Sequence, residues 1–193
     1  VRKDASPAIK DAVAVARLRG AGAGLVGHAN MTEFAYSGLG LNPHYGTPLT
    51  PLKEGCIAGG STSGGASAVA RGVADIALGT DTGGSARIPA AFCGLFGFKA
   101  TAQTISREGA VPLSHSLDSV GVLTRDVGLL RPVLNVLRDR PLPASSAPRA
   151  VIVPENFGMD GLDTEVVDAF EAALEVLRAS GVSVRRQTLD FFE

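Results

Sequence analysis

Hydrophobic positions near the C-terminus recur at strand spacing, then at helix spacing, then at strand spacing again. A helix is predicted over 164–180, where apolar residues return about every three to four positions and Gly181 ends the pattern. Short apolar or alternating segments on either side predict strands over 149–154 and 182–189. This strand–helix–strand order predicts a βαβ unit with a parallel strand pair, because parallel strands need a long crossover.

The preceding part of the chain, residues 1–148, predicts a further set of short elements joined by loops. The predicted helices are 11–23, 64–72 and 126–138, and the predicted strands are 24–27, 74–81 and 94–99. We also predict one helical turn over 32–37, a long loop over 38–60 and a linker over 141–148. Pro132 is expected to start or kink the helix that contains it. Together these elements predict an α/β fold with a mixed central β-sheet flanked by helices.

Composition places the chain among globular proteins and argues against nucleic acid or a membrane surface as a partner. Hydrophobic residues make up 45% and charged residues 19% of the 193 positions, a profile too apolar for a disordered chain. Eighteen Lys and Arg balance 19 Asp and Glu, which leaves no basic field to attract nucleic acid or an anionic membrane. The chain shows no apolar stretch of membrane-spanning length, of about 18 residues, and no signal-peptide core. Cys56 and Cys93 form neither a disulfide framework nor a zinc motif, so we expect a reducing cytoplasmic location.

Glycine is enriched where candidate chemistry lies. The 24 glycines are about 12% of the chain, against an average of about 7%, and most lie between residues 20 and 121. Two clusters carry serines, GGSTSGGAS at 59–67 and DTGGSARIP at 81–89. One short helix and one strand separate Ser61 from Ser85, so we expect the chain to return on itself between them. The two glycines before Ser85 allow consecutive N–H groups to point into one space, as an oxyanion hole requires.

Simpler interpretations of these clusters have to be considered. A single Gly-Gly-Ser is usually a turn, and glycine-rich loops also bind phosphates. No lysine follows the glycines as the Walker pattern requires, and the Gly-x-Ser-x-Gly elbow is absent around Ser85. A Ser-His-Asp triad is therefore not supported. His28, His44 and His115 have no Cys or His partner at metal-binding spacing, so we expect no metal site.

A longer pattern around both clusters resembles the signature of a known family. The run GGSTSGGASAVARGVADIALGTDTGGSARIPAAFCGLFGFK is similar to the glycine/serine signature of the amidase signature family, and the flanks AGAGLVGHANMTEFAYSGLG and VPLSHSLDSVGVLTRDV resemble it too. The resemblance is strong over 11–130 and weak over 149–190. It implies one partial amidase domain over 1–193, with 11–130 as the signature core and 149–193 as a βαβ continuation. It also implies hydrolysis of carboxylic amides by a Ser–cis-Ser–Lys triad, without a cofactor.

The resemblance assigns a role to each matching residue. Ser85 matches the nucleophile, and Ser61 matches the bridging serine, which follows a cis peptide bond from Gly60 and lies within hydrogen-bonding reach of Ser85. The oxyanion-hole backbone is matched by Thr82, Gly83, Gly84 and Ser85. Asp81 and Arg87 match charged residues that brace the nucleophile loop. Ala35 matches a backbone contact to substrate, to which Ser61 also contributes.

The catalytic lysine is the point where this sequence departs from the family. In relatives it lies in an apolar strand well upstream of the bridging serine, and neither Lys3 nor Lys10 matches that position. We therefore interpret the chain as the middle of a longer protein and expect residues 1–193 alone to be inactive. The expected partners are a small-molecule amide and, as a candidate, a second copy of the chain. Two alternatives remain open: the glutaminase subunit of a tRNA-dependent amidotransferase, and a catalytically inactive binding or scaffold fragment.

Overall fold

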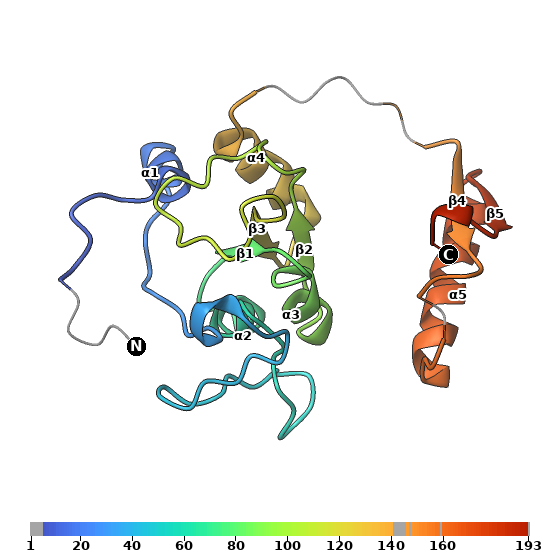
Figure 1. Cartoon of the computed structure of the whole chain (residues 1–193), viewed down its shortest axis with the longest axis horizontal. Coiled ribbons are helices and arrows are strands. Elements are labelled where there is room, and N and C mark those ends of the chain that lie inside the picture. Colours follow the sequence, from blue (N-terminus) through green and yellow to red (C-terminus); the bar gives the residue numbers. More distant parts are fainter. Residues whose placement is uncertain (1–5, 141–145, 147, 159, 193) are drawn as a thin grey trace. The chain divides into compact units, whose positions relative to one another are not determined.

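The chain divides into two compact units, with the boundary between Leu142 and Pro143. A computed structural model describes residues 6–140, 146, 148–158 and 160–192 (Figure 1). The predicted linker over 141–148 lies outside these residues, apart from positions 146 and 148. The two units are described separately below.

The first unit is built on a three-stranded antiparallel sheet in the order β1-β3-β2. Its elements in chain order are α1 (Val13–Gly20), η1 (Glu33–Ala35), α2 (Ser63–Ala70), β1 (Ile76–Asp81), α3 (Arg87–Phe92), β2 (Phe96–Lys99), β3 (Ser119–Thr124) and α4 (Val127–Leu137). Strand β3 lies in the centre, and all six of its residues are buried. Its first residue, Ser119, pairs with Asp81 at the end of β1, which brings the segment before β3 beside the segment after β1.

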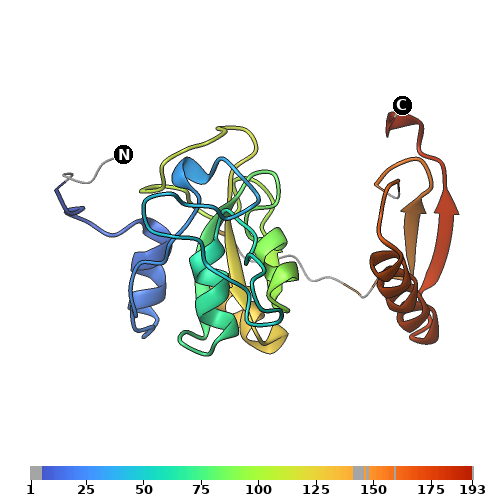
Figure 2. The same ribbon diagram turned by 90° about the horizontal axis from the view of Figure 1, so that it is seen from below.

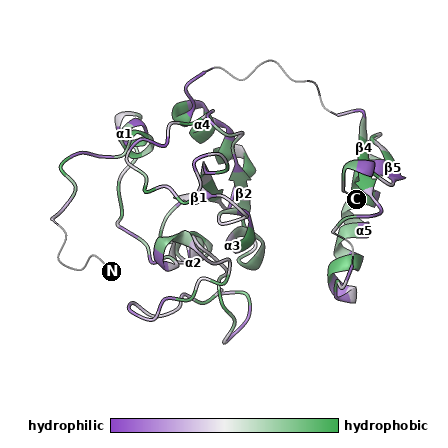
Figure 3. Cartoon of the chain, viewed as in Figure 1, coloured by the Kyte–Doolittle hydropathy of each residue, from purple (hydrophilic) through white to green (hydrophobic). Residues whose placement is uncertain are grey.

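Each face of this sheet is covered by a different pair of helices. On one face, Val120 and Val122 of β3 pack in a hydrophobic cluster with residues of α1 and α4. On the other face, Leu123 packs with alanines of α2 and α3 and with Cys93. Helices α3 and α4 and strand β2 are largely in the green of hydrophobic residues in Figure 3. The result is a sheet between two helical layers.

Small residues let α3 approach the sheet closely. A Cβ atom added at Gly121 of β3 would lie 2.5 Å from Cβ of Ala86, and one added at Gly97 of β2 would lie 2.6 Å from Cβ of Ala90. These distances are too short for real side chains, so glycine is required on the sheet at both contacts. The close packing fixes the start of α3, and with it the turn that joins β1 to α3.

The second unit confirms the predicted βαβ order. It contains β4 (Ala150–Pro154), α5 (Thr164–Ala179), β5 (Ser183–Gln187) and η2 (Asp190–Phe192). Strands β4 and β5 pair in parallel, from Ala150 opposite Ser183 to Pro154 opposite Gln187. Figure 2 shows both arrows running in the same direction beside α5. Val153 of β4 and Leu174 of α5 are buried, and α5 packs against β5.

The α/β fold predicted from the sequence is confirmed, with helices flanking an antiparallel sheet in one unit and a parallel pair in the other. The strand predicted over 24–27 is wrong, because these residues join no ladder and Leu25 and Val26 are exposed. Helix α3 and strand β3 were not predicted. Within the described ranges, no helix combines the length and the apolar character needed to cross a membrane.

Candidate active site

Ser85 lies on the short turn that connects β1 to α3. Ser85 is 7% exposed. The preceding Gly84 has φ +136°, a backbone conformation that residues with a side chain rarely adopt. The turn continues into the helix through a hydrogen bond that Ile88 N donates to Gly84 O at 2.7 Å. The nucleophile predicted from the resemblance is thus held on a tight turn between a strand and a helix.

Replacing the two glycines of this turn by alanine is expected to affect stability differently. Gly84→Ala is expected to lower the free energy of unfolding by about 1–2 kcal/mol, because of its positive φ and because the new Cβ would lie 2.7 Å from Ile88 Cδ1. Gly83→Ala is the matched control, since a Cβ there meets no atom within 4 Å, and we expect no loss of stability. Urea unfolding of the two variants measures the difference. Equal losses would show that the backbone of the turn is not the constraint.

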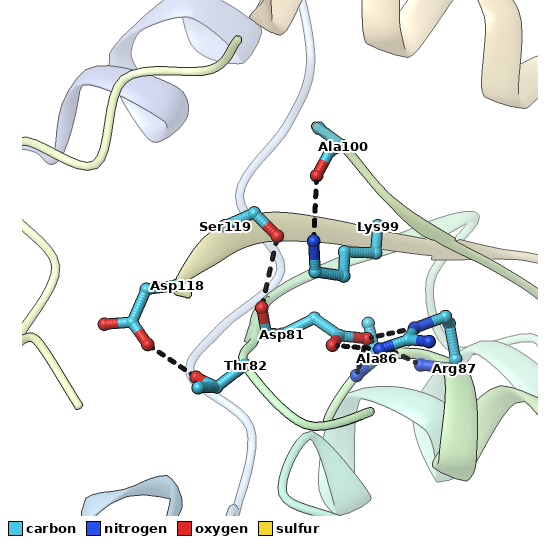
Figure 4. A network of polar contacts seen from close by, with 8 residues as sticks. All are labelled: Asp81, Thr82, Ala86, Arg87, Lys99, Ala100, Asp118 and Ser119. Atoms are coloured by element: carbon cyan, nitrogen blue, oxygen red, sulfur yellow. Dashed lines mark hydrogen bonds and ion pairs between the residues drawn. The ribbon is translucent and has the colours of Figure 1, made fainter. Parts of the chain in front are cut away.

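Asp81, the last residue of β1, binds both the side chain and the backbone that follow the turn. Its carboxylate accepts hydrogen bonds from Arg87 Nε at 3.0 Å and Arg87 Nη2 at 2.9 Å, and from the N–H groups of Ala86 at 3.1 Å and Arg87 at 3.2 Å (Figure 4). Burial opposes ionisation of this fully buried group, but these donors hold its pKa below the usual range. The same contact raises the pKa of Arg87. Asp81 therefore fixes the end of the turn.

Thr82, the first residue of the turn, is bound by a carboxylate that the sequence analysis did not single out. Thr82 Oγ1 donates to Asp118 Oδ1 at 2.5 Å, and Asp118 is 4% exposed (Figure 4). Burial would raise the pKa of Asp118, but the Thr82 hydroxyl, backbone N–H groups and nearby Arg107 lower it. Asp118 directly precedes Ser119, the first residue of β3, and therefore lies opposite Thr82. This position could have been predicted from the sequence only if β3 and its register with β1 had been recognised.

The structure brings the two glycine/serine clusters together, as predicted from the sequence. Thr62 N donates to Ser85 O at 3.2 Å, and the peptide bond between Gly60 and Ser61 is cis. Ser61 Oγ is buried and has no hydrogen-bond partner among the described residues. The expected contact between the two serine hydroxyls is therefore not formed here, and the clusters are joined through their backbones.

Ala35 lies on a segment that packs directly against the Ser61 cluster. Thr32 N donates to Ser61 O at 3.1 Å, and Gly60 N donates to Gly38 O at 2.7 Å. Ala35 itself has φ +58°, an unusual backbone conformation for a residue other than glycine. The same segment borders a shallow pocket of about 490 Å³, lined by His28, Ala29, Asn30, Met31, Glu33, Asn42, His44 and Tyr45. The segment that carries Ala35, the predicted substrate contact, is thus hydrogen-bonded to the cluster that carries Ser61.

Two of the described lysines, Lys10 and Lys99, have other partners. Lys10 Nζ lies 2.7 Å from Glu108 Oε1, and Lys99 Nζ donates to the carbonyl of Ala100 at 3.3 Å. Lys3 lies outside the described residues. The triad base implied by the resemblance is therefore not assigned to Lys10 or Lys99.

Metal and thiol chemistry are not indicated by the described residues. Within 6–140, 146, 148–158 and 160–192, no three His, Cys, Asp or Glu side chains gather as a metal site would require. Cys93 is buried, donates weakly to Ala58 O at 3.6 Å, and has a pKa raised by burial. It packs as a small hydrophobic residue beneath α3.

Comparison with known proteins relates this arrangement to a family. A family model described as Amidase matches residues 3–191. Indoleacetamide hydrolase of Pseudomonas savastanoi is 44% identical over 176 residues, which cover 89% of this chain and 38% of that protein. One subunit of the glutamyl-tRNA(Gln) amidotransferase of Solidesulfovibrio magneticus is 39% identical over 193 residues, covering 90% of this chain and 40% of that protein. A crystal structure of an amidase, 42% identical, has a TM-score of 0.87 over 95% of this chain and 43% of its own. The chain thus spans about two-fifths of the length of these relatives.

Proposed function

The chain belongs to the amidase family, and on that premise we propose that the full-length protein hydrolyses a carboxylic amide through an acyl-enzyme on Ser85. The observation that carries the proposal is the junction of the two serine clusters, where Thr62 N binds Ser85 O at 3.2 Å. The turn from Thr82 to Ser85 offers several backbone N–H groups beside the serine, as acyl transfer requires. Because the family model matches residues of both units, we also propose that they belong to one amidase domain.

The proposed reaction has two halves that use the same residues. Ser85 Oγ attacks the carbonyl carbon of the amide while its proton passes to Ser61, and the N–H groups of the turn bind the oxyanion. The C–N bond then breaks, the leaving amine or ammonia takes up the proton, and an ester on Ser85 remains. Water attacks this ester, the carboxylic acid leaves, and Ser85 recovers its proton.

Ser61 is suited to pass a proton onward because its buried hydroxyl is not committed to another described group. The final acceptor in this proposal is a lysine that this chain does not supply. A buried lysine can serve as a base because loss of hydration lowers its pKa. The role of Ser61 is therefore to connect Ser85 to a base on another segment of the full-length protein.

Two alternative functions, that of an amidotransferase subunit and that of a non-catalytic scaffold, are favoured by particular relatives. The glutamyl-tRNA(Gln) amidotransferase relatives favour glutamine as the amide, with ammonia passed to a partner protein. A relative named Translocon at the outer membrane of chloroplasts 64, from Pisum sativum, is 40% identical over 150 residues, which cover 78% of this chain and 25% of that protein. This relative favours the third possibility, a binding or scaffold function without catalysis.

Ammonia release and covalent labelling distinguish these functions. We expect the full-length protein to release ammonia from benzamide or indole-3-acetamide and to be labelled by a fluorophosphonate on the peptide that contains Ser85. Release from glutamine alone, increased by a co-purifying partner, would support the amidotransferase function. No release from any amide and no label on Ser85 would support the scaffold.

Residues 1–193 alone are predicted to hydrolyse these amides about 10²–10⁴-fold more slowly than the full-length protein. This is the usual contribution of a general base to the rate. Ammonia release by equal concentrations of the two proteins measures the difference. Hydrolysis by residues 1–193 at the full-length rate, abolished by Ser85→Ala, would contradict this prediction and would place the base within this chain.

A further inference from the structure

Asp118 and Thr82 continue the ladder between β1 and β3 beyond its last paired residues. The final ladder pair joins Asp81 to Ser119, so the next positions along the two strands are Thr82 and Asp118. Their side chains meet there in a hydrogen bond of 2.5 Å from the hydroxyl to the carboxylate (Figure 4). Ser119 Oγ donates to Asp81 O at 3.1 Å and holds the same junction from the neighbouring position.

Asp118 is itself firmly held. Its two carboxylate oxygens accept hydrogen bonds from Leu113 N at 2.8 Å and from Ser114 N at 3.0 Å. Arg107 Nη1 donates to the backbone carbonyl of Asp118 at 3.3 Å. A pocket of about 190 Å³ lies beside these residues, so the loop before β3 depends on polar contacts rather than dense packing there. The carboxylate is a fixed point against which Thr82 is placed.

We propose that Asp118 is a positioning residue for the nucleophile turn, which it holds in place through the hydroxyl of Thr82. The inference rests on the proposed function, since it concerns how the N–H groups of residues 82–85 are aimed. Asp81 fixes the far end of this turn through Ala86 N and Arg87 N. Gly83 and Gly84 between the two ends have wide backbone freedom, so both ends must be held for the donors to point in one direction.

The chemistry of the contact decides which substitutions are informative. Backbone N–H groups donate to both carboxylate oxygens of Asp118, Ser114 N to Oδ1 and both Leu113 N and Ser114 N to Oδ2, so the NH₂ group of asparagine would face an N–H in either orientation. The Thr82 hydroxyl can both donate and accept, so Thr82→Val is the variant that removes the contact outright. Thr82→Val keeps the shape of the side chain and removes the hydroxyl. Thr82→Ser keeps the hydroxyl and removes a methyl group. Asp126→Asn is the matched control, because Asp126 accepts a backbone hydrogen bond from Gly128 N at 2.7 Å and has no role in the turn.

Steady-state kinetics of the full-length protein test the proposal. Asp118→Asn and Thr82→Val are each expected to lower kcat about 10–100-fold, below the loss of about 10²–10³ for one missing oxyanion donor, with KM changed less than threefold. The kcat of the double variant should be no lower than that of the more impaired single variant, because both substitutions disrupt the same hydrogen bond. Thr82→Ser should recover most of the activity lost in Thr82→Val, and Asp126→Asn should keep wild-type kcat. Wild-type kcat in Thr82→Val, or additive losses in the double variant, would overturn the proposal.

Hydrogen exchange keeps this test separate from the proposed function. If wild-type protein and Ser85→Ala are equally inactive, the proposed function fails, while exchange at the turn still reports on its positioning. We expect Asp118→Asn and Thr82→Val to speed amide exchange in the peptide covering residues 82–88 at least tenfold, with wild-type rates in Asp126→Asn. Wild-type exchange at this peptide in both turn variants would show that Asp118 only stabilises its own loop.

Discussion

Ser85→Ala is expected to abolish amide hydrolysis by the full-length protein, with a loss in kcat of about 10⁴–10⁶-fold. The size follows from the chemistry, because removing the nucleophile of an acyl-transfer site leaves only the contribution of the oxyanion donors and substrate binding. The turn that holds Ser85 is fixed by its backbone and by Asp81, so alanine should leave it folded. Ammonia release under saturating amide measures the loss.

The control for this experiment is a serine outside the turn. Ser180 follows α5, is exposed, and donates its hydroxyl to Leu177 O within the same helix end. Ser180→Ala should keep wild-type kcat and wild-type labelling by the fluorophosphonate. A Ser85→Ala variant that retained more than about one hundredth of the wild-type kcat would remove Ser85 from the role of nucleophile.

The elements of the C-terminal unit were predictable from their hydrophobic pattern, whereas strand β3 was not. Helix α5 and its flanking strands show clear periodicity and were predicted nearly to their ends. Strand β3 is buried on both faces, so its residues do not alternate and the signal is lost. The run at 24–27 has strand-like composition, but no neighbouring strand pairs with it. In the second case the lack of a pairing partner outweighed local propensity.

The candidate site shows the same division. The glycines around Ser61 and Ser85 were visible as a local pattern, and a return of the chain between them was predicted from the helix and strand they enclose. The junction itself, from Thr62 N to Ser85 O, confirms that prediction. Asp118 lies 36 positions after Thr82, and its contact with Thr82 depends on the register of a strand that the pattern did not reveal. Contacts set by register are the part of a site that sequence periodicity cannot supply.

Arg87→Met is expected to lower the free energy of unfolding by about 2–4 kcal/mol, because it leaves the fully buried Asp81 carboxylate without its cation. This loss of stability is expected to be no larger than the loss on breaking a fully buried ion pair. The reason is that the Arg87 side chain is 51% exposed, so water partly screens the contact. Urea unfolding of the full-length protein at pH 7 measures the change. The control is the same substitution in an Asp81→Asn background, where no buried charge remains and the loss should be much smaller.

The pH dependence of this loss identifies the carboxylate as its cause. In the wild type the pKa of Asp81 is lowered, so the pair stabilises the fold above the unfolded-state value of about 3.9 and this contribution is lost as pH falls through the folded-state pKa. In Arg87→Met, burial is opposed only by the N–H groups of Ala86 and residue 87, so the pKa of Asp81 rises. The stability difference between wild type and Arg87→Met should therefore be largest near neutral pH and shrink below about pH 4. A difference that stayed constant from pH 7 to pH 3 would mean that Arg87 acts through the packing of its aliphatic stem and not through the charge of Asp81.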